Sequence, residues 1–328
     1  MSKLSRRQLL ACTALPLLGV GSTAARAQPA RDMTIVVAYP AGGSLDAMAR
    51  VLAQKLAGIR GHSVVVDNRP GFSGNIGAQY VAKAPADGRT VLMTALTTYA
   101  INASLMGASA GYDLMKDFEH VAIVGNLPNV MIVPAALPVN TLQEFIQAAK
   151  KQPGGFSYAT TGNGSLEHVA GEMFKRATGV EMLAVPYKGS APAITDLIGG
   201  QIQAMFVNTS TAINNLKAGR IKVLAVAGPA RSPALPQVPT MRELGIKLTN
   251  DVVSIFGIAA PHGTPKAVVD RLNADLNKAL KEPEVHERFE ALGIEVVTQD
   301  AAYARKKIAS EVAVWAKVIG ETGITLQQ

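Results

Sequence analysis

The chain has 328 residues, of which 48% are hydrophobic and 17% are charged, and its formal net charge is +8. The apolar content suffices for one large or two medium globular domains and excludes a largely disordered chain. The positive charge would suit a nucleic-acid-binding protein, but its distribution along the chain argues against that class.

The first 27 residues are typical of an export signal. Early positive charge, a short apolar run and the motif Ala25-Arg26-Ala27 before Gln28 indicate secretion and cleavage. The apolar run is shorter than the roughly 20 residues of a membrane-spanning helix. Arg6-Arg7 also resembles a twin-arginine signal, so general secretion and twin-arginine export both stay open.

Removal of this segment changes the charge and the cysteine count. The segment contains four of the 32 basic residues and none of the 24 acidic ones, so 28 and 24 remain, a net charge of +4. A nucleic-acid partner is therefore not expected. The single cysteine, Cys12, also leaves, so a disulfide, a thiol nucleophile and a cysteine metal site are excluded.

Beyond the signal, β-branched runs alternate with turns and amphipathic helices. Residues 33–38 form the first expected strand, and Ser44 begins a helix whose apolar residues recur at helical spacing. Further strands are expected at residues 63–67 and 90–93. This alternation predicts an α/β fold.

A second block with the same pattern starts near Asn126. Helices are expected to begin at Thr141, at Ser165 and near Ser190, and the helix from Ser165 should end at Gly179. The strands expected in this block are residues 129–133, 156–159, 182–185, 204–207 and 223–227.

The second block interrupts the first. Residues 229–239 include four prolines and should cross the surface, after which Thr264-Pro265 should cap and open a long helix. Two crossings between lobes would enclose a cleft, which is a common ligand site. The predicted lobes are residues 28–125 together with 229–328, and residues 126–228.

Glycine-rich turns recur where strands give way to helices. Free backbone N–H groups and the positive end of a helix dipole at such junctions suit an anion. Each turn alone is also explained by a serine N-cap with turn glycines, but the occurrence of these turns in both lobes favours a binding site. The turns are Ala41–Ser44, Arg69–Gly77, Thr160–Ser165 and Tyr187–Ser190.

Five segments together carry a family resemblance. They are YPAGGSLD (39–46), DNRPGFSGNIG (67–77), ADGRT (86–90), PYKGSAPA (186–193) and VPT (238–240). In this order they resemble the Bug family, the periplasmic substrate-binding proteins of tripartite tricarboxylate transporters, over essentially the whole mature chain. The resemblance implies an α/β, two-lobed, type II periplasmic-binding-protein fold that closes on a small carboxylated solute in the cleft between the lobes.

The resemblance also implies the ligand contacts. In the family, the turns at 41–44 and 160–165 hold the ligand carboxylate from opposite lobes through backbone, hydroxyl and ordered water. The family usually has Phe at position 39 and Pro at position 41, so the polarity of the aromatic wall stays open here. The residues predicted to contact ligand are Tyr39, Ala41, Gly42, Gly43, Ser44, Asp46, Phe72, Thr160, Thr161, Gly162, Asn163, Gly164, Ser165, Lys188 and Asn208.

Four conspicuous side chains have a structural interpretation as well. Asp46 could cap its helix, or could favour an amine if it faces the pocket. Lys188 could meet an acid or simply be solvated. Phe72 and Tyr99 could flank the cleft or pack in the core.

Two catalytic motifs are missing from the mature sequence. It contains no Ser-x-x-Lys or His-Glu-x-x-His, and its five histidines lack metal-ligand spacing. We therefore expect a non-enzymatic monomer without cofactor or metal. It should capture a mono-, di- or tricarboxylate, an amino acid or an aromatic acid and deliver it to the permease subunits of a transporter. A sensory partner of a membrane histidine kinase and an esterase-like hydrolase are the alternatives.

Overall fold

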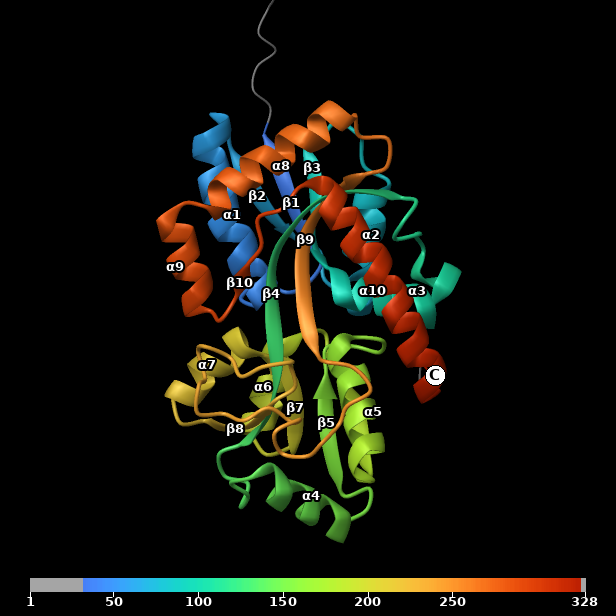
Figure 1. The fold of residues 1–328 in the computed structure, drawn as a ribbon, viewed down its shortest axis with the longest axis vertical. Helices are drawn as coiled ribbons and strands as arrows, with labels where there is room; N and C mark the ends of the chain where they lie inside the picture. Colours follow the sequence, from blue (N-terminus) through green and yellow to red (C-terminus); the bar gives the residue numbers. More distant parts are fainter. Residues whose placement is uncertain (1–31, 326–328) are drawn as a thin grey trace, which may run out of the picture. The chain divides into compact units, whose positions relative to one another are not determined.

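The computed structural model describes residues 32–325, and the predicted export signal lies outside them. These residues belong to one compact unit built around a ten-stranded sheet (Figure 1). The strands are β1 (Met33–Val37), β2 (Val64–Asn68), β3 (Thr90–Ala95), β4 (Phe118–Pro134), β5 (Phe156–Thr160), β6 (Met182–Pro186), β7 (Ala204–Asn208), β8 (Ile221–Val226), β9 (Val253–Pro261) and β10 (Glu295–Val296).

Helices follow most of these strands along the chain. The α-helices are α1 (Ser44–Arg60), α2 (Asn75–Ala82), α3 (Leu96–Leu105), α4 (Leu142–Lys151), α5 (Leu166–Thr178), α6 (Ser190–Ile198), α7 (Thr209–Lys217), α8 (Lys266–Leu280), α9 (Pro283–Ala291) and α10 (Ala301–Thr322). Two short 3-10 helices are η1 (Phe72–Gly74) and η2 (Gly107–Ala110). None of the helices within residues 32–325 has the length and apolar character needed to cross a bilayer.

The sheet consists of two parallel groups joined by antiparallel strands. The strand order is β2-β1-β3-β9-β4-β7-β5-β6, with β8 and β10 also paired to β4. In the first group β1 is parallel to β2 and β3, and in the second group β5 is parallel to β6 and β7. β9 lies antiparallel to β3 and β4, and β4 lies antiparallel to β7.

β4 runs through both groups. Residues 118–128 pair with β9, whereas residues 129–134 pair with β7 and β8. Figure 1 shows β4 in green and β9 in orange as long neighbouring strands. The sequence predicted only residues 129–133 of β4, because Gly125 and Pro128 interrupt its β pattern. The pairing with β9 shifts register twice within residues 120–125, and such irregularities bend a strand.

Most predicted helix boundaries are confirmed, with one exception. The hydroxyls of Thr141 and Ser165 accept the backbone N–H three residues later, and Gly179 ends α5 in the left-handed conformation at φ 69°. The predicted cap at Thr264 is wrong. Its hydroxyl donates to the Pro261 carbonyl at 2.7 Å, and α8 starts without a side-chain cap.

The proline-rich segment packs with the second group of strands. Val226 of β8 forms an isolated bridge with Thr240, and Leu235 and Val238 belong to the same buried cluster as residues of β7 and α6. The segment therefore lies beside the second group, although the prediction assigned it to the first lobe. The residue boundaries of the two lobes stay a prediction, because contacts unite the described residues in one unit.

The hydrophobic core is continuous on one face of the sheet and divided on the other. Val36 of β1 and Met131 of β4 point into one cluster that spans both groups. Their neighbours Val37 and Val130 point to the opposite face, where they belong to two separate clusters. Alternate residues of a strand face opposite sides, so the division follows from the strand period. A pocket lies between these two clusters, lined by Leu45 and Phe256 of one and by Val207 of the other.

Candidate functional site

The pocket is a small cavity of about 70 Å³ lined by both groups of strands and by the starts of five helices. This volume accommodates several water molecules, or a short organic acid. The lining residues are Tyr39, Pro40, Ala41, Gly43, Ser44, Leu45, Ala95, Thr97, Thr98, Thr161, Glu167, Gly189, Ser190, Ala191, Val207, Asn208, Thr211, Ser254, Ile255 and Phe256.

The sheet topology explains why helix starts gather here. β1, β3, β5, β6 and β7 are each followed by a helix, so the helices begin at the carboxyl ends of these strands. In α/β sheets, ligands bind in the crevice outside those ends. The first turns of α1, α3, α5, α6 and α7 all contribute lining residues. Five helix N-termini therefore bring their partial positive charges to one cavity.

The start of α1 depends on two glycines with different conformations. Gly42 adopts φ +88°, in the left-handed region that favours glycine, whereas Gly43 has φ −81°. Gly43 is the N-cap of α1 and receives no side-chain cap. The predicted helix start at Ser44 is confirmed, whereas the alternative interpretation of Ser44 as an N-cap is wrong. Ser190 likewise opens α6 as its first residue, after Gly189 at the N-cap.

The hydroxyl of Ser44 instead reaches across to the second group of strands. It forms hydrogen bonds with the hydroxyls of Ser210 and Thr211 on α7. A second contact between the groups joins the Ser73 hydroxyl, as donor, to the Asn163 carbonyl at 2.7 Å. Direct hydrogen bonds thus join the two groups of strands at and beside the pocket.

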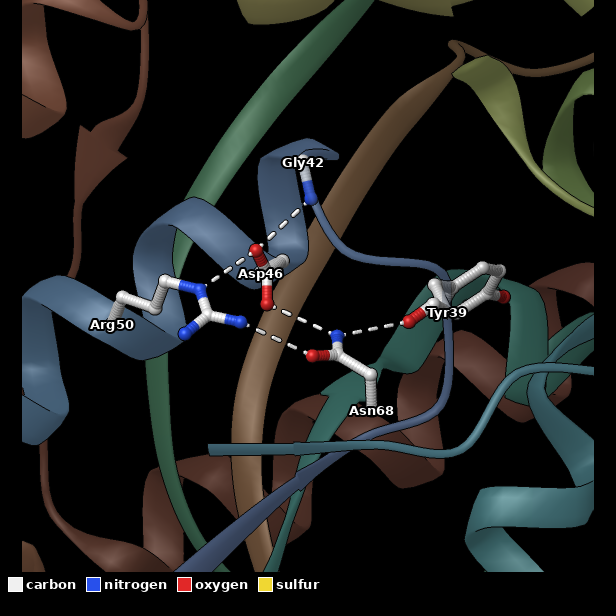
Figure 2. Close-up of polar contacts among 5 residues, drawn as sticks. All are labelled: Tyr39, Gly42, Asp46, Arg50 and Asn68. Carbon is white, nitrogen blue, oxygen red and sulfur yellow. Dashed lines mark hydrogen bonds and ion pairs between the residues drawn. The ribbon is translucent and has the colours of Figure 1, made fainter. Parts of the chain in front are cut away.

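Asp46 holds the turn after β1 rather than lining the pocket (Figure 2). One carboxylate oxygen accepts the Gly42 N–H at 3.0 Å and Arg50 Nε at 2.9 Å, and the other accepts Asn68 Nδ2 at 3.0 Å. Asn68 also donates to the Tyr39 carbonyl at 3.1 Å. Burial alone would raise the pKa of Asp46, but the hydrogen bonds from Arg50, Gly42 and Asn68 hold it below its ordinary value.

Tyr39 forms a neutral aromatic wall of the pocket. Its hydroxyl donates to the Ser73 carbonyl at 3.1 Å. Burial, followed by the nearby charge of Glu167, raises the pKa of Tyr39 far above its ordinary value. The phenol therefore stays protonated, with its proton donated to Ser73, and contributes no charge to the pocket.

The predicted turn before α5 faces the pocket only in part. Thr161 lines it, but the Thr160 hydroxyl accepts the Gly162 N–H at 3.3 Å, and the Gly164 N–H donates to Nδ1 of His168 at 3.3 Å. Ser165 is buried as the N-cap. The residue of α5 that reaches the pocket is Glu167.

The remaining predicted residues divide between two hollows. Tyr39, Ala41, Gly43, Ser44, Thr161 and Asn208 line the main pocket. Phe72, Gly162, Asn163 and Lys188 line a neighbouring hollow, which also includes Tyr39 and Thr161. Tyr99 is fully buried, in the edge-to-face ring contact with Tyr112. Whether any of these residues contacts a ligand stays a prediction.

Sequence reasoning missed several lining residues. Thr97 and Thr98 of α3 and Thr211 of α7 lie within three residues of a strand end, whereas Glu167 lies in the first turn of α5, seven residues after β5. A systematic search of the positions after each parallel strand would have found the three threonines. α3 was missed because Leu96 continues from β3 without a glycine or proline to mark the change.

The charge pattern of the lining is unusual. Of the lining residues that the structure describes, none is a lysine, arginine or histidine, and Glu167 is the one charged side chain. Positive potential for an anion must therefore come from helix N-termini and backbone N–H groups. The hydroxyls of Ser44, Thr98, Ser190 and Thr211 can add hydrogen bonds, whereas the Thr97 hydroxyl already donates to the Val253 carbonyl at 2.9 Å.

Comparisons with known proteins agree with this architecture. The structure matches that of the periplasmic binding protein BugD with a TM-score of 0.86 at 36% identity, covering 91% of this chain and 100% of that one. It matches R. palustris Rpa4515, solved with adipate, with a TM-score of 0.86 at 36% identity, covering 91% and 99%. Fold and site thus define an α/β, two-lobed periplasmic binding protein with its pocket between the lobes.

Sequence comparisons identify the family. Residues 48–324 match the model of the tripartite tricarboxylate transporter family receptor, TctC. The UPF0065 protein in the tcbD-tcbE intergenic region of Pseudomonas sp. (strain P51) is 36% identical over 330 residues, covering 100% of this chain and 98% of that protein. The chain belongs to the TctC family of transporter receptors, which includes the Bug proteins, and the resemblance predicted from the sequence is confirmed.

Proposed function

We propose that this chain is a periplasmic solute-binding protein that captures a small carboxylate in the pocket and delivers it to the membrane subunits of a tripartite tricarboxylate transporter. The observation that supports it best is the convergence of five helix N-termini on a cavity without basic side chains. Adipate in a relative of 36% identity supports a carboxylate as the ligand. The receptor description of the family supports delivery to a transporter.

The available donors are sufficient for useful affinity. A micromolar ligand needs about 8 kcal/mol of net binding free energy. Hydrogen bonds to a charged group contribute roughly 1.5–3 kcal/mol each, so three or four of them reach that figure before the cost of closure is subtracted. Apolar walls such as Tyr39 and Phe256 would supply the remainder.

A thermal-unfolding screen of protein purified from the periplasm tests the proposal. The panel consists of short mono-, di- and tricarboxylates, amino acids and aromatic acids, each paired with its primary amide as a neutral control. A ligand at 100 times its dissociation constant should add about 2.7 kcal/mol of stability. We expect at least one acid to stabilise the protein and its amide to have no effect. If only amides stabilise the protein, or if none of the acids does, the proposal is wrong.

The same preparation tests export. N-terminal sequencing should find Gln28 as the first residue, because the cleavage motif precedes it. Periplasmic material that still begins at Met1 would contradict cleavage at this site.

A further inference from the structure

We infer that the pocket selects acids that also contain a protonated amine, and that Glu167 contacts this amine. The inference rests on the proposed function and adds the chemical class of the ligand. It starts from the one charged side chain in the pocket lining.

Glu167 is held firmly at the edge of the pocket. It lies in the first turn of α5 and is 8% exposed. Its carboxylate accepts the Thr161 hydroxyl at 2.7 Å. This bond and the burial of the side chain fix the orientation of the carboxylate.

The charge of Glu167 has no counter-charge among the residues that the structure describes. In residues 32–325 its carboxylate forms no ion pair with a lysine, arginine or histidine. The adjacent His168 turns Nδ1 to the Gly164 N–H, and burial lowers the pKa of His168, which keeps its ring neutral. Neutral donors stabilise a buried carboxylate without cancelling its charge, so a cation beside it is favourable.

The chemistry of the pocket therefore has two ends. The first turns of α1, α3, α6 and α7 offer backbone and hydroxyl donors, which suit a carboxylate. Glu167 offers an acceptor with negative charge, which suits an ammonium group. A second carboxylate at the same place would face like charge, so the site would discriminate against it. Burial raises the pKa of Glu167, which fits a carboxyl group that lacks a cation until ligand arrives.

Calorimetry with matched ligand pairs tests the inference. Aspartate with succinate, glutamate with glutarate, and 6-aminohexanoate with hexanoate differ within each pair by one amine. In the wild-type protein the amine-containing member of at least one pair should bind at least about tenfold tighter, as expected for a close, desolvated charge pair. In Glu167→Gln this ratio should fall to about one, mainly because the amine-containing ligand binds more weakly.

Glu172→Gln provides the matched control. Glu172 lies on the same helix, but its carboxylate bonds with the Tyr158 hydroxyl and Lys175 outside the pocket, so the preference should persist. Circular dichroism and thermal unfolding establish that each variant is folded. If Glu167→Gln does not fold, Thr161→Val keeps the charge but removes the hydroxyl that orients it, and should lower the preference.

The possible outcomes separate this inference from the proposed function. If acids bind without preference for the amine, or if Glu167→Gln keeps the preference, the inference is wrong and carboxylate capture stands. If no acid in the pairs or the screening panel binds at all, carboxylate capture itself is wrong and the inference fails with it.

Discussion

The two adjacent glycines of the first turn serve different purposes, although the sequence presents them as a pair. Gly42 needs its left-handed φ of +88°, and a side chain there would meet open space. Gly43 has an ordinary φ of −81°, but its Cβ would lie 3.9 Å from the Pro40 carbonyl oxygen and from Ser190 Oγ. Both neighbours line the pocket. A side chain at Gly43 would therefore extend among pocket residues without a clash at its Cβ, and local sequence alone does not distinguish the two roles.

Asp46 should stabilise both the fold and the binding turn. Asp46→Asn keeps the size of the side chain but removes the charge that accepts hydrogen bonds from Gly42, Arg50 and Asn68. We expect the free energy of unfolding at pH 7 to fall by about 1–3 kcal/mol, measured by urea denaturation. Affinity for acids should also fall, because the Asp46 carboxylate no longer holds the Gly42 N–H and the turn that it belongs to.

The pKa of Asp46 sets the sign of its pH dependence. Because this pKa is lowered in the folded protein, the stabilisation is complete above the ordinary aspartate pKa and is lost as pH falls through the folded value. Asp67→Asn is the control, since its pair with Arg69 is 37% and 39% exposed and should contribute less than about 1 kcal/mol. Equal losses in the two variants would show that the Asp46 network has no special role.

At the scale of elements, alternating strands and helices were largely predictable. The β-branched runs located β1 to β3 and β5 to β8, and turn glycines marked the starts of α1 and α5. β9 was missed, because Gly257 and the terminal Pro261 weaken its strand pattern. The amino-terminal part of β4 was missed for the same reason. Tertiary pairing between these two long strands overrides their weak local preference.

β4 contains a buried histidine that should make stability depend on pH. Nε2 of His120 donates to the Leu114 carbonyl at 2.9 Å, while Nδ1 is buried without a partner among the described residues. Burial lowers the pKa of His120 from 6.5 to about 4. Between these two values the unfolded chain binds a proton that the folded protein does not. The free energy of unfolding is therefore unaffected by His120 above pH 6.5 and falls as the pH decreases from 6.5 to about 4.

Unfolding free energies across that pH range test this prediction. The decrease attributable to His120 should approach 1.4 kcal/mol per pH unit at its steepest. His120→Gln should show a shallower decrease than the wild-type protein. His262→Gln is the control, because the His262 side chain is 69% exposed and its variant should keep the wild-type slope. An unchanged slope in His120→Gln would contradict the account.

At the scale of the whole molecule, the site depends on which strand ends become neighbours. The family resemblance indicated two turns, at 41–44 and 160–165. Thr97 and Thr211 join them only because the sheet order places β3 and β7 beside the central strands, whereas Glu167 lies two residues beyond the second turn. No local pattern encodes that order, since it results from packing between segments far apart in the sequence. The class of protein was therefore predictable, whereas the full set of pocket residues was not.

The central claim is that helix N-termini and backbone N–H groups, not a basic side chain, bind the carboxylate. Calorimetry of Gly43→Val and Lys188→Ala with an acid that stabilises the wild-type protein tests it most directly. Gly43→Val should stay folded, because φ at this position is −81°, yet lose binding by more than about a hundredfold as its side chain enters the pocket. Lys188→Ala should stay within about threefold of wild type, because Lys188 is exposed outside the main pocket. Normal affinity in folded Gly43→Val, or a loss concentrated at Lys188→Ala, would contradict the claim.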